Sequence, residues 1–180
     1  EIRGPTQEKQ RHLFEVNLQK TIDALEENEM VEKNRRMNKS PNKDNRFNKQ
    51  FGVSMLYPSV YKLVKDTVNF VWFQKQIPKG HLNIIAYEIS ENSFSGNIKK
   101  RIVQIRDSIG KIYLPGRLPN THMITEKAYR PYFYQTKAFK RKAYLTKGMW
   151  EVKNDFMAGP FINYMILDTT KHKRLVIEGF

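Results

Sequence analysis

The sequence contains no cysteine among its 180 residues. Disulfide bridges, thiolate metal sites and a cysteine nucleophile are therefore excluded within this chain. Long hydrophobic runs are also missing. The longest apolar runs, such as Phe70–Phe73, fall far short of the ~20 apolar residues that a membrane-spanning helix requires. The sequence therefore predicts no membrane-spanning segment.

Common catalytic and cofactor motifs are absent as well. There is no Gly-x-Ser-x-Gly elbow, His-Glu-x-x-His pair, phosphate-binding loop or dinucleotide-binding glycine pattern. The four histidines lie far apart in the sequence, and none has a further ligand at metal-site spacing: His12, His81, His122 and His172. We therefore predict no catalytic residue, no metal site and no cofactor, and the sequence favours a non-enzymatic domain.

Acidic residues are few relative to basic ones, with 18 Asp and Glu against 32 Lys and Arg, so the formal net charge is +14. Such a surface attracts polyanions at low ionic strength, including anionic lipid head groups and nucleic acid. The segment Lys33–Lys49 is rich in basic residues and asparagine and holds the single acid Asp44. This composition is typical of a solvated loop, and we interpret residues 34–49 as a basic linker.

The N-terminal segment has the pattern of an amphipathic helix. Phe14, Leu18, Ile22 and Leu25 recur at helical spacing in a stretch without glycine or proline. We therefore predict a helix within residues 1–33 that docks through a narrow apolar stripe. Its partner is either the following domain or a preceding half of a longer protein.

Residues 50–180 have the pattern of one α+β domain. Short strand-like segments with turn residues between them surround one amphipathic helix, in which Ile98, Ile102, Ile105 and Ile109 share a face. This order predicts an antiparallel sheet of about six or seven strands covered by that helix. The chain ends in an apolar run, Leu175–Phe180, that resembles the middle of a strand, which suggests that the domain is truncated there.

Local signals predict where individual elements begin and end. Gly110 is expected to end the isoleucine helix as a left-handed residue. The first strand, the turns and the connections are expected at these positions: a strand at 51–55, turns at Ile77–Gly80 and Gly159–Pro160, a loop at 113–120, a basic connection at 137–142 and a polar hairpin loop at 168–173.

Four segments resemble a family of uncharacterised lipoproteins from Bacteroidetes envelopes, classified as a domain of unknown function. The matching segments are Asn69–Phe73, Arg106–Gly110, Gly148–Phe161 and Leu175–Phe180. The resemblance implies a lipid-anchored protein of the cell envelope, since family members begin with a lipoprotein signal. The order of elements is also similar to the PsbP and Mog1 type of fold, a likeness of architecture alone.

Four residues are candidates for binding a ligand or partner. Trp150 is either a sheet-packing aromatic or a ligand-stacking one. Glu151 either forms a carboxylate pair with Asp155 or is a solvated charge. Arg106 and Asp107 either form a salt-bridged helix end that orders the following loop or contact a partner.

Three functions follow, in order of preference. The leading expectation is a non-enzymatic domain of an envelope lipoprotein that binds a partner protein, a glycan or an envelope component. The second is a nucleic-acid-binding module, because aromatic and basic residues alternate between Tyr129 and Tyr144. No recognised nucleic-acid motif accompanies them, so nucleic acid is the less favoured partner. A hydrolase of unknown type is third.

Overall fold

The computed structural model describes residues 3–94 and 96–180, which form two compact units. The first unit comprises the chain up to Lys43 together with Leu56–Ser59, and the second comprises Asp44–Met55 and Val60–Phe180. The segment interpreted as a linker, residues 34–49, contains the end of one helix and the start of another. Each unit is described by itself.

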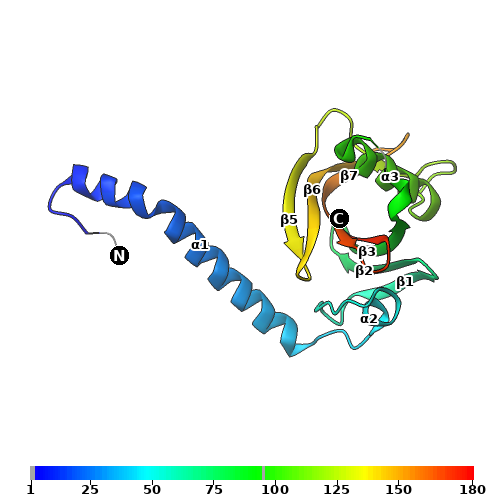
Figure 1. Ribbon diagram of the computed structural model, residues 1–180, viewed down its shortest axis with the longest axis horizontal. Helices are drawn as coiled ribbons and strands as arrows, with labels where there is room; N and C mark the ends of the chain where they lie inside the picture. The colour runs from blue at the N-terminus through cyan, green and yellow to red at the C-terminus, as the bar shows by residue number, and fades with distance from the viewer. Residues whose placement is uncertain (1–2, 95) are drawn as a thin grey trace. The chain divides into compact units, whose positions relative to one another are not determined.

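The first unit is dominated by helix α1 (Gln7–Lys39) (Figure 1). The side chain of Thr6 accepts a hydrogen bond from the amide of Lys9 at 3.3 Å and caps the helix. The predicted N-terminal helix is therefore confirmed, and it extends six residues past Lys33, as far as Lys39. None of residues 7–39 is buried, so the apolar stripe through Phe14 and Leu25 is exposed.

The second unit is an antiparallel sheet with two helices, which confirms the α+β prediction. Within the described residues the sheet has eight strands, and its main path runs β1-β2-β3-β8-β7-β6-β4, with β5 paired to β6. The strands are β1 (Lys62–Thr67), β2 (Phe70–Ile77), β3 (Gly80–Ser90), β4 (Met123–Thr125), β5 (Tyr132–Ala138), β6 (Arg141–Val152), β7 (Ala158–Asp168) and β8 (Lys173–Gly179).

Helix α3 (Ile98–Tyr113) packs on one face of this sheet, and the curled strands and α3 surround a common interior (Figure 1). Asn97 caps the helix by accepting from the amide of Lys100. Ile102 and Ile105 are buried against Met165 and other strand residues. The predicted cover helix is confirmed, because its isoleucine stripe buries apolar surface that the sheet alone would leave in water.

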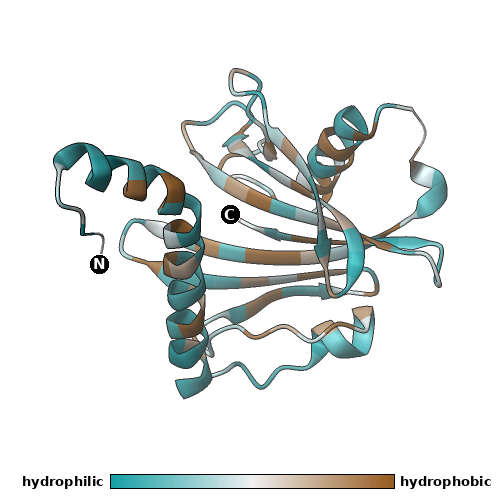
Figure 2. Ribbon diagram, turned by 60° about the vertical axis from the view of Figure 1, so that its left-hand side comes forward, coloured by the Kyte–Doolittle hydropathy of each residue, from teal (hydrophilic) through white to brown (hydrophobic). Residues whose placement is uncertain are grey.

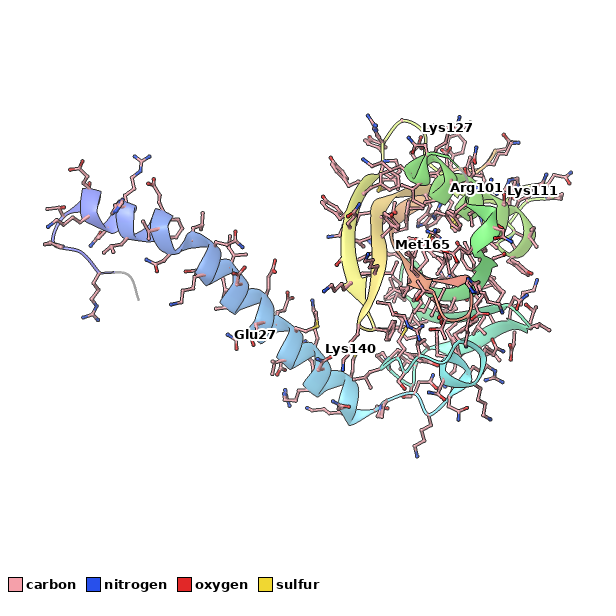
Figure 3. All side chains as sticks on the ribbon, viewed as in Figure 1. Glu27, Arg101, Lys111, Lys127, Lys140 and Met165 are labelled. Carbon is pink, nitrogen blue, oxygen red and sulfur yellow. The ribbon has the colours of Figure 1, made fainter. Side chains whose placement is uncertain are left out.

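Apolar residues lie on the middle strands and on α3, whereas the turns are mainly polar (Figure 2). Met165 lies in the interior, while Lys111 on α3 and Lys127 extend outward (Figure 3). Apart from the buried Arg106, the basic side chains of the described residues are exposed or half-buried around the core.

The opposite face of the sheet is covered in part by helix α2 (Arg46–Phe51), where the sequence analysis places a strand at 51–55. That prediction is wrong. Phe47 and Phe51 lie one helical turn apart and are both buried, and Phe47 stacks on Phe73 of β2 at 5.7 Å. Gly52 ends the helix in the left-handed conformation at φ 68°. Phe51 and Val53 are both buried, but Phe51 ends the short helix and Val53 lies in the irregular segment after it, so their alternation does not mark a strand.

The predicted end of α3 at Gly110 is also wrong, since the helix continues to Tyr113. Gly110 is buried, and a Cβ there would overlap the backbone carbonyl of Met123. The glycine is needed for this close approach between α3 and β4, and its backbone has an ordinary helical conformation.

Two segments that were predicted as connections belong largely to strands. Gly159 and Pro160 belong to β7, and the turn precedes them. Pro160 is tolerated because β7 pairs there only with β6, its register with β8 beginning at Ile162. The basic segment 137–142 is strand apart from a tight turn at Phe139 and Lys140.

Two strands were missed. In β1 the apolar residues are outnumbered by charged ones, which suits an exposed edge strand but gives no clear alternation. The strand β4 has three residues and depends on its pairing with β6 and its packing against α3. The turn at Ile77–Gly80, the loop after α3 and the polar loop before β8 are where the sequence predicts them.

Candidate functional site

The second unit contains a cavity of about 540 Å³ beside the end of α3. Its walls come from the β2–β3 hairpin, the loop after α3, β6 and the start of β7. The lining residues are Trp72, Gln74, Ile77, Lys79, Gly80, His81, Leu82, Asn83, Leu114, Pro115, Gly116, Arg117, Met123, Trp150, Val152, Met157, Ala158, Gly159, Pro160 and Phe180. The volume suits a small organic group or part of a larger ligand.

Aromatic side chains form much of the wall. Trp150 and Phe180 meet edge to face, with ring centroids 5.9 Å apart. Gly159 lies opposite Trp150 in the β6–β7 register, and a Cβ at Gly159 would lie 3.0 Å from the indole. The absence of a side chain at Gly159 therefore allows the Trp150 ring to lie against the backbone of β7.

The second tryptophan of the wall, Trp72, is fixed by an amide cluster. Asn83 Oδ1 accepts hydrogen bonds from Trp72 Nε1 at 2.9 Å and from Gln74 Nε2 at 3.0 Å. By contrast, Trp150 Nε1 is buried and has no hydrogen-bond partner among the described residues. This N–H faces the backbone of β7, since a Cβ at Gly159 would lie 3.0 Å from Nε1, and a buried donor without a partner costs free energy on folding.

Exposed apolar and basic side chains lie next to lining residues of the cavity in the sequence, and we refer to the segments 117–118 and 153–157 as its mouth. Phe156, in the β6–β7 turn directly before the lining residue Met157, is 106% exposed. Leu118, next to the lining residue Arg117, is also exposed. Arg117 pairs with Asp155 at 3.0 Å and lowers the pKa of that carboxyl below its ordinary value. Exposed apolar residues at a pocket mouth are typical of an interaction surface.

Arg106 is placed differently from the predicted helix-end salt bridge. It points into the interior of the sheet and forms a buried ion pair with Glu178 at 2.9 Å. Glu178 also accepts from Asn163 Nδ2 at 2.8 Å, and the guanidinium lies 3.8 Å from the centre of the Phe161 ring. Burial and the Glu178 carboxylate raise the pKa of Tyr87. These contacts satisfy a charge pair that would otherwise be costly to bury.

Asp107 joins the same network through Thr125. The Thr125 amide and hydroxyl both donate to Asp107 Oδ1 at 2.7 Å, and Arg106 donates to the Thr125 hydroxyl at 3.0 Å. Thr125 is also the cross-strand partner of Trp150. The structure thus brings Arg106, Asp107 and Trp150 together around β4, behind the cavity wall at Met123.

Glu151 follows Trp150 in β6 and therefore lies on the opposite face of the strand. Its partner, Glu126, was not predicted from the sequence. The Glu151 side chain hydrogen-bonds to Glu126, not to Asp155, and this contact raises the pKa of Glu151. The amide of Ala128 donates to Glu126 at 2.8 Å and lowers the pKa of Glu126. The two residues are half-buried and are not part of the cavity lining.

Several residues of the cavity, including Trp72, Asn83 and Phe180, were not predicted from the sequence. Trp72 lies within a segment quoted for the family resemblance, but its pattern is that of any buried strand. Asn83 is the better signal, since a polar residue in an apolar central strand must find a partner or a function.

The cavity wall contains few groups of the kinds used in acid–base or nucleophilic catalysis. Among the described residues, the lining contains no carboxylate, hydroxyl or thiol side chain, and His81 is its only imidazole. Lys79 and His81 are the lining side chains that could accept a proton. Residues 3–94 and 96–180 also hold no cluster of three or more His, Asp or Glu that could bind a metal.

The described part of the chain has no helix long and apolar enough to cross a membrane. No curated protein matches the chain. Residues 40–180 match the family model described as Domain of unknown function (DUF4837), and because this match covers more than half of the sequence, the chain belongs to that family.

Proposed function

We propose that the chain is a non-enzymatic binding domain of a cell-envelope lipoprotein, and that the cavity holds part of its partner: a protein, a glycan or another envelope component. The observation that carries the proposal is the composition of the cavity wall. Two tryptophans and Phe180 line a space of about 540 Å³, and its described lining holds no carboxylate, hydroxyl or thiol side chain. Apolar pockets with few convergent polar groups are typical binding sites.

The arrangement of polar groups supports recognition. The Asn83–Gln74–Trp72 cluster holds one indole in a single orientation, and the Trp150 indole is held against the backbone at Gly159. A rigid aromatic wall loses little conformational entropy when a ligand binds. The Arg106–Glu178 pair behind Met123 fixes the strands that carry this wall.

Placement in the cell envelope with a lipid anchor rests on the resemblance to envelope lipoproteins. Net charge +14 supports it, because a basic surface suits an anionic membrane. Metabolic labelling with a radioactive fatty acid tests this placement for the protein expressed from its natural reading frame. Label in the protein band of the membrane fraction is expected, and an unlabelled protein in the cytosol would contradict the placement.

Tryptophan fluorescence tests the binding role, because Trp72 and Trp150 are the only two tryptophans and both line the cavity. A glycan, a lipid or a peptide that occupies the cavity is expected to shift the emission in a saturable way. Gln74→Phe fills part of the space and should weaken the shift while the protein stays folded. If none of the three ligand classes changes the emission, the binding role assigned to the cavity is wrong.

Exposed tyrosines on β5 favour a second candidate, nucleic-acid binding. Tyr132 and Tyr134 are exposed on one face of this strand, and basic residues lie beside them in β6. Bases could stack on these rings. Binding of a single-stranded oligonucleotide that persists at about 0.2 M salt and is lost in Tyr132→Ala would support it.

A further inference from the structure

The cavity has an apolar wall and very few polar groups. Within the described residues, its uncharged hydrogen-bonding side chains are Gln74, His81, Asn83 and the two indoles, and three of these five already bond to one another. A sugar ring carries several hydroxyl groups that each need a partner, and this wall offers few groups for them. An alkyl chain needs none, so the wall suits a ligand with an apolar chain.

The charges at the mouth favour an anionic group at the other end of such a ligand. Lys79 and Arg117 belong to the lining, and Lys153 lies in the same β6–β7 turn as Phe156. The one acid there, Asp155, is paired with Arg117. Positive charge therefore predominates around the opening, which complements an anionic head group that stays in water while the chain is buried.

Phe156 supplies an independent observation. Its ring is fully exposed one residue before the lining residue Met157 and gains no burial from the fold. An exposed aromatic ring beside basic side chains is the arrangement by which peripheral proteins enter the interfacial region of an anionic bilayer. Leu118, exposed next to Arg117, adds apolar surface at the same opening.

We propose that the cavity binds an acyl chain of an anionic membrane lipid, and that the loops at its mouth, with Phe156 foremost, contact the bilayer from which the chain enters. This inference rests on the proposed binding function and specifies the ligand class. The lipid head group remains near Lys79 and Arg117, and the chain lies against Trp72 and Trp150.

The test uses vesicles of phosphatidylglycerol whose acyl chains carry bromine, compared with vesicles of the same lipid without bromine. Bromine quenches indole fluorescence only at short range. Because Trp72 and Trp150 lie in the cavity wall, quenching reports entry of a chain into the cavity and not mere adsorption to the surface. The experiment is run at about 0.2 M salt to screen non-specific attraction by the basic surface.

Matched variants test the roles of the cavity and of its mouth separately. Gln74→Phe should reduce the quenching while vesicle sedimentation is retained. Phe156→Ser should weaken sedimentation about tenfold, since a phenyl ring no longer enters the bilayer. Phe139→Ser is the control, because Phe139 lies in the hairpin turn at the opposite end of β6 and is also exposed. Lys79→Gln, at a lining residue, and Lys140→Gln, in the same turn as Phe139, form a second pair of test and control variants.

Four outcomes decide the inference. Bromine-dependent quenching that Gln74→Phe reduces supports it, together with weaker sedimentation of Phe156→Ser but not of Phe139→Ser. Equal emission with brominated and plain vesicles overturns it. If emission instead shifts saturably with a chitin oligosaccharide or a peptide, the lipid assignment is overturned and the binding function stands. If emission responds to none of these probes, the binding function fails as well.

Discussion

Arg106 and Glu178 lie 72 positions apart in the sequence and form an ion pair that is almost fully shielded from water, with side-chain exposures of 2% and 0%. The pair joins α3 to β8 through the interior of the sheet. Taking two charges out of water is expensive, and the hydrogen bonds from Asn163 and to Thr125 offset part of that cost. The pair therefore couples the packing of α3 to that of β8.

Removing one charge of this pair should be strongly destabilising. Glu178→Gln leaves the Arg106 guanidinium buried without a counter-ion, and we expect a loss of about 3–5 kcal/mol in the free energy of unfolding. Urea denaturation measures it. The control is Lys173→Gln, which breaks a partly exposed pair with Glu88 at 2.8 Å and should cost about 1 kcal/mol or less. Equal losses in the two variants would contradict a special role for burial.

Ile105→Asp should unfold the second unit. The side chain of Ile105 is 8% exposed and packs in the core between α3 and the sheet, so a carboxylate there would be buried without a partner. Ile112 lies on the same helix and is 63% exposed, which makes Ile112→Asp the matched control. Calorimetry should show no cooperative transition for Ile105→Asp and a nearly unchanged one for Ile112→Asp.

Gly110→Ala should destabilise the protein although alanine is the better helix former. The new methyl group would overlap the Met123 carbonyl, and forcing α3 away from β4 is expected to cost about 1–3 kcal/mol. Chemical denaturation measures the change. Gly179→Ala provides the comparison, because a Cβ there meets its nearest neighbour at 3.6 Å and needs no rearrangement. A more stable Gly110→Ala variant would show that α3 and β4 are farther apart.

The β5–β6 turn should be stabilised by substitution. Phe139 and Lys140 both have positive φ, 49° and 61°, a conformation that asparagine and glycine adopt at lower cost. The double substitution Phe139→Asn with Lys140→Gly is expected to raise the free energy of unfolding by about 1–2 kcal/mol. Thermal unfolding tests it, and a lower Tm would mean that the Phe139 ring contributes more to packing than its backbone costs.

Glu151→Gln should stabilise the protein at neutral pH and have little effect at acidic pH. The Glu126 contact raises the folded-state pKa of Glu151, so the stability that comes from protonated Glu151 is present below its unfolded pKa and is lost as the pH rises through the folded value. Glutamine keeps an N–H donor toward Glu126 at every pH. The pKa of Glu126 is lowered, so its own contribution has the opposite sign and is lost as the pH falls.

Thermal unfolding between about pH 4 and pH 7 measures this difference. The gain in Tm of Glu151→Gln over the unaltered protein should grow as the pH rises through the folded-state pKa of Glu151. A gain that is constant across this range would show that Glu126 and Glu151 do not share a proton.

The sequence by itself determined the fold class and the elements with strong periodic patterns. Four isoleucines at helical spacing define α3 because only one face of that helix can enter the core. The paired strands β2 and β3 follow from two apolar segments joined by turn residues. These features depend on residues close together in the chain, which is why local patterns suffice.

Tertiary structure alone decided the remaining features. Phe47 and Phe51 form a helix because both rings find a place on the sheet, and Gly110 is fixed by a carbonyl from β4. The partner of Arg106 is 72 residues away, and the cavity joins residues from four separate segments around Trp72 and Trp150. Such contacts depend on strand register and on sheet curvature, which no local pattern in the sequence specifies.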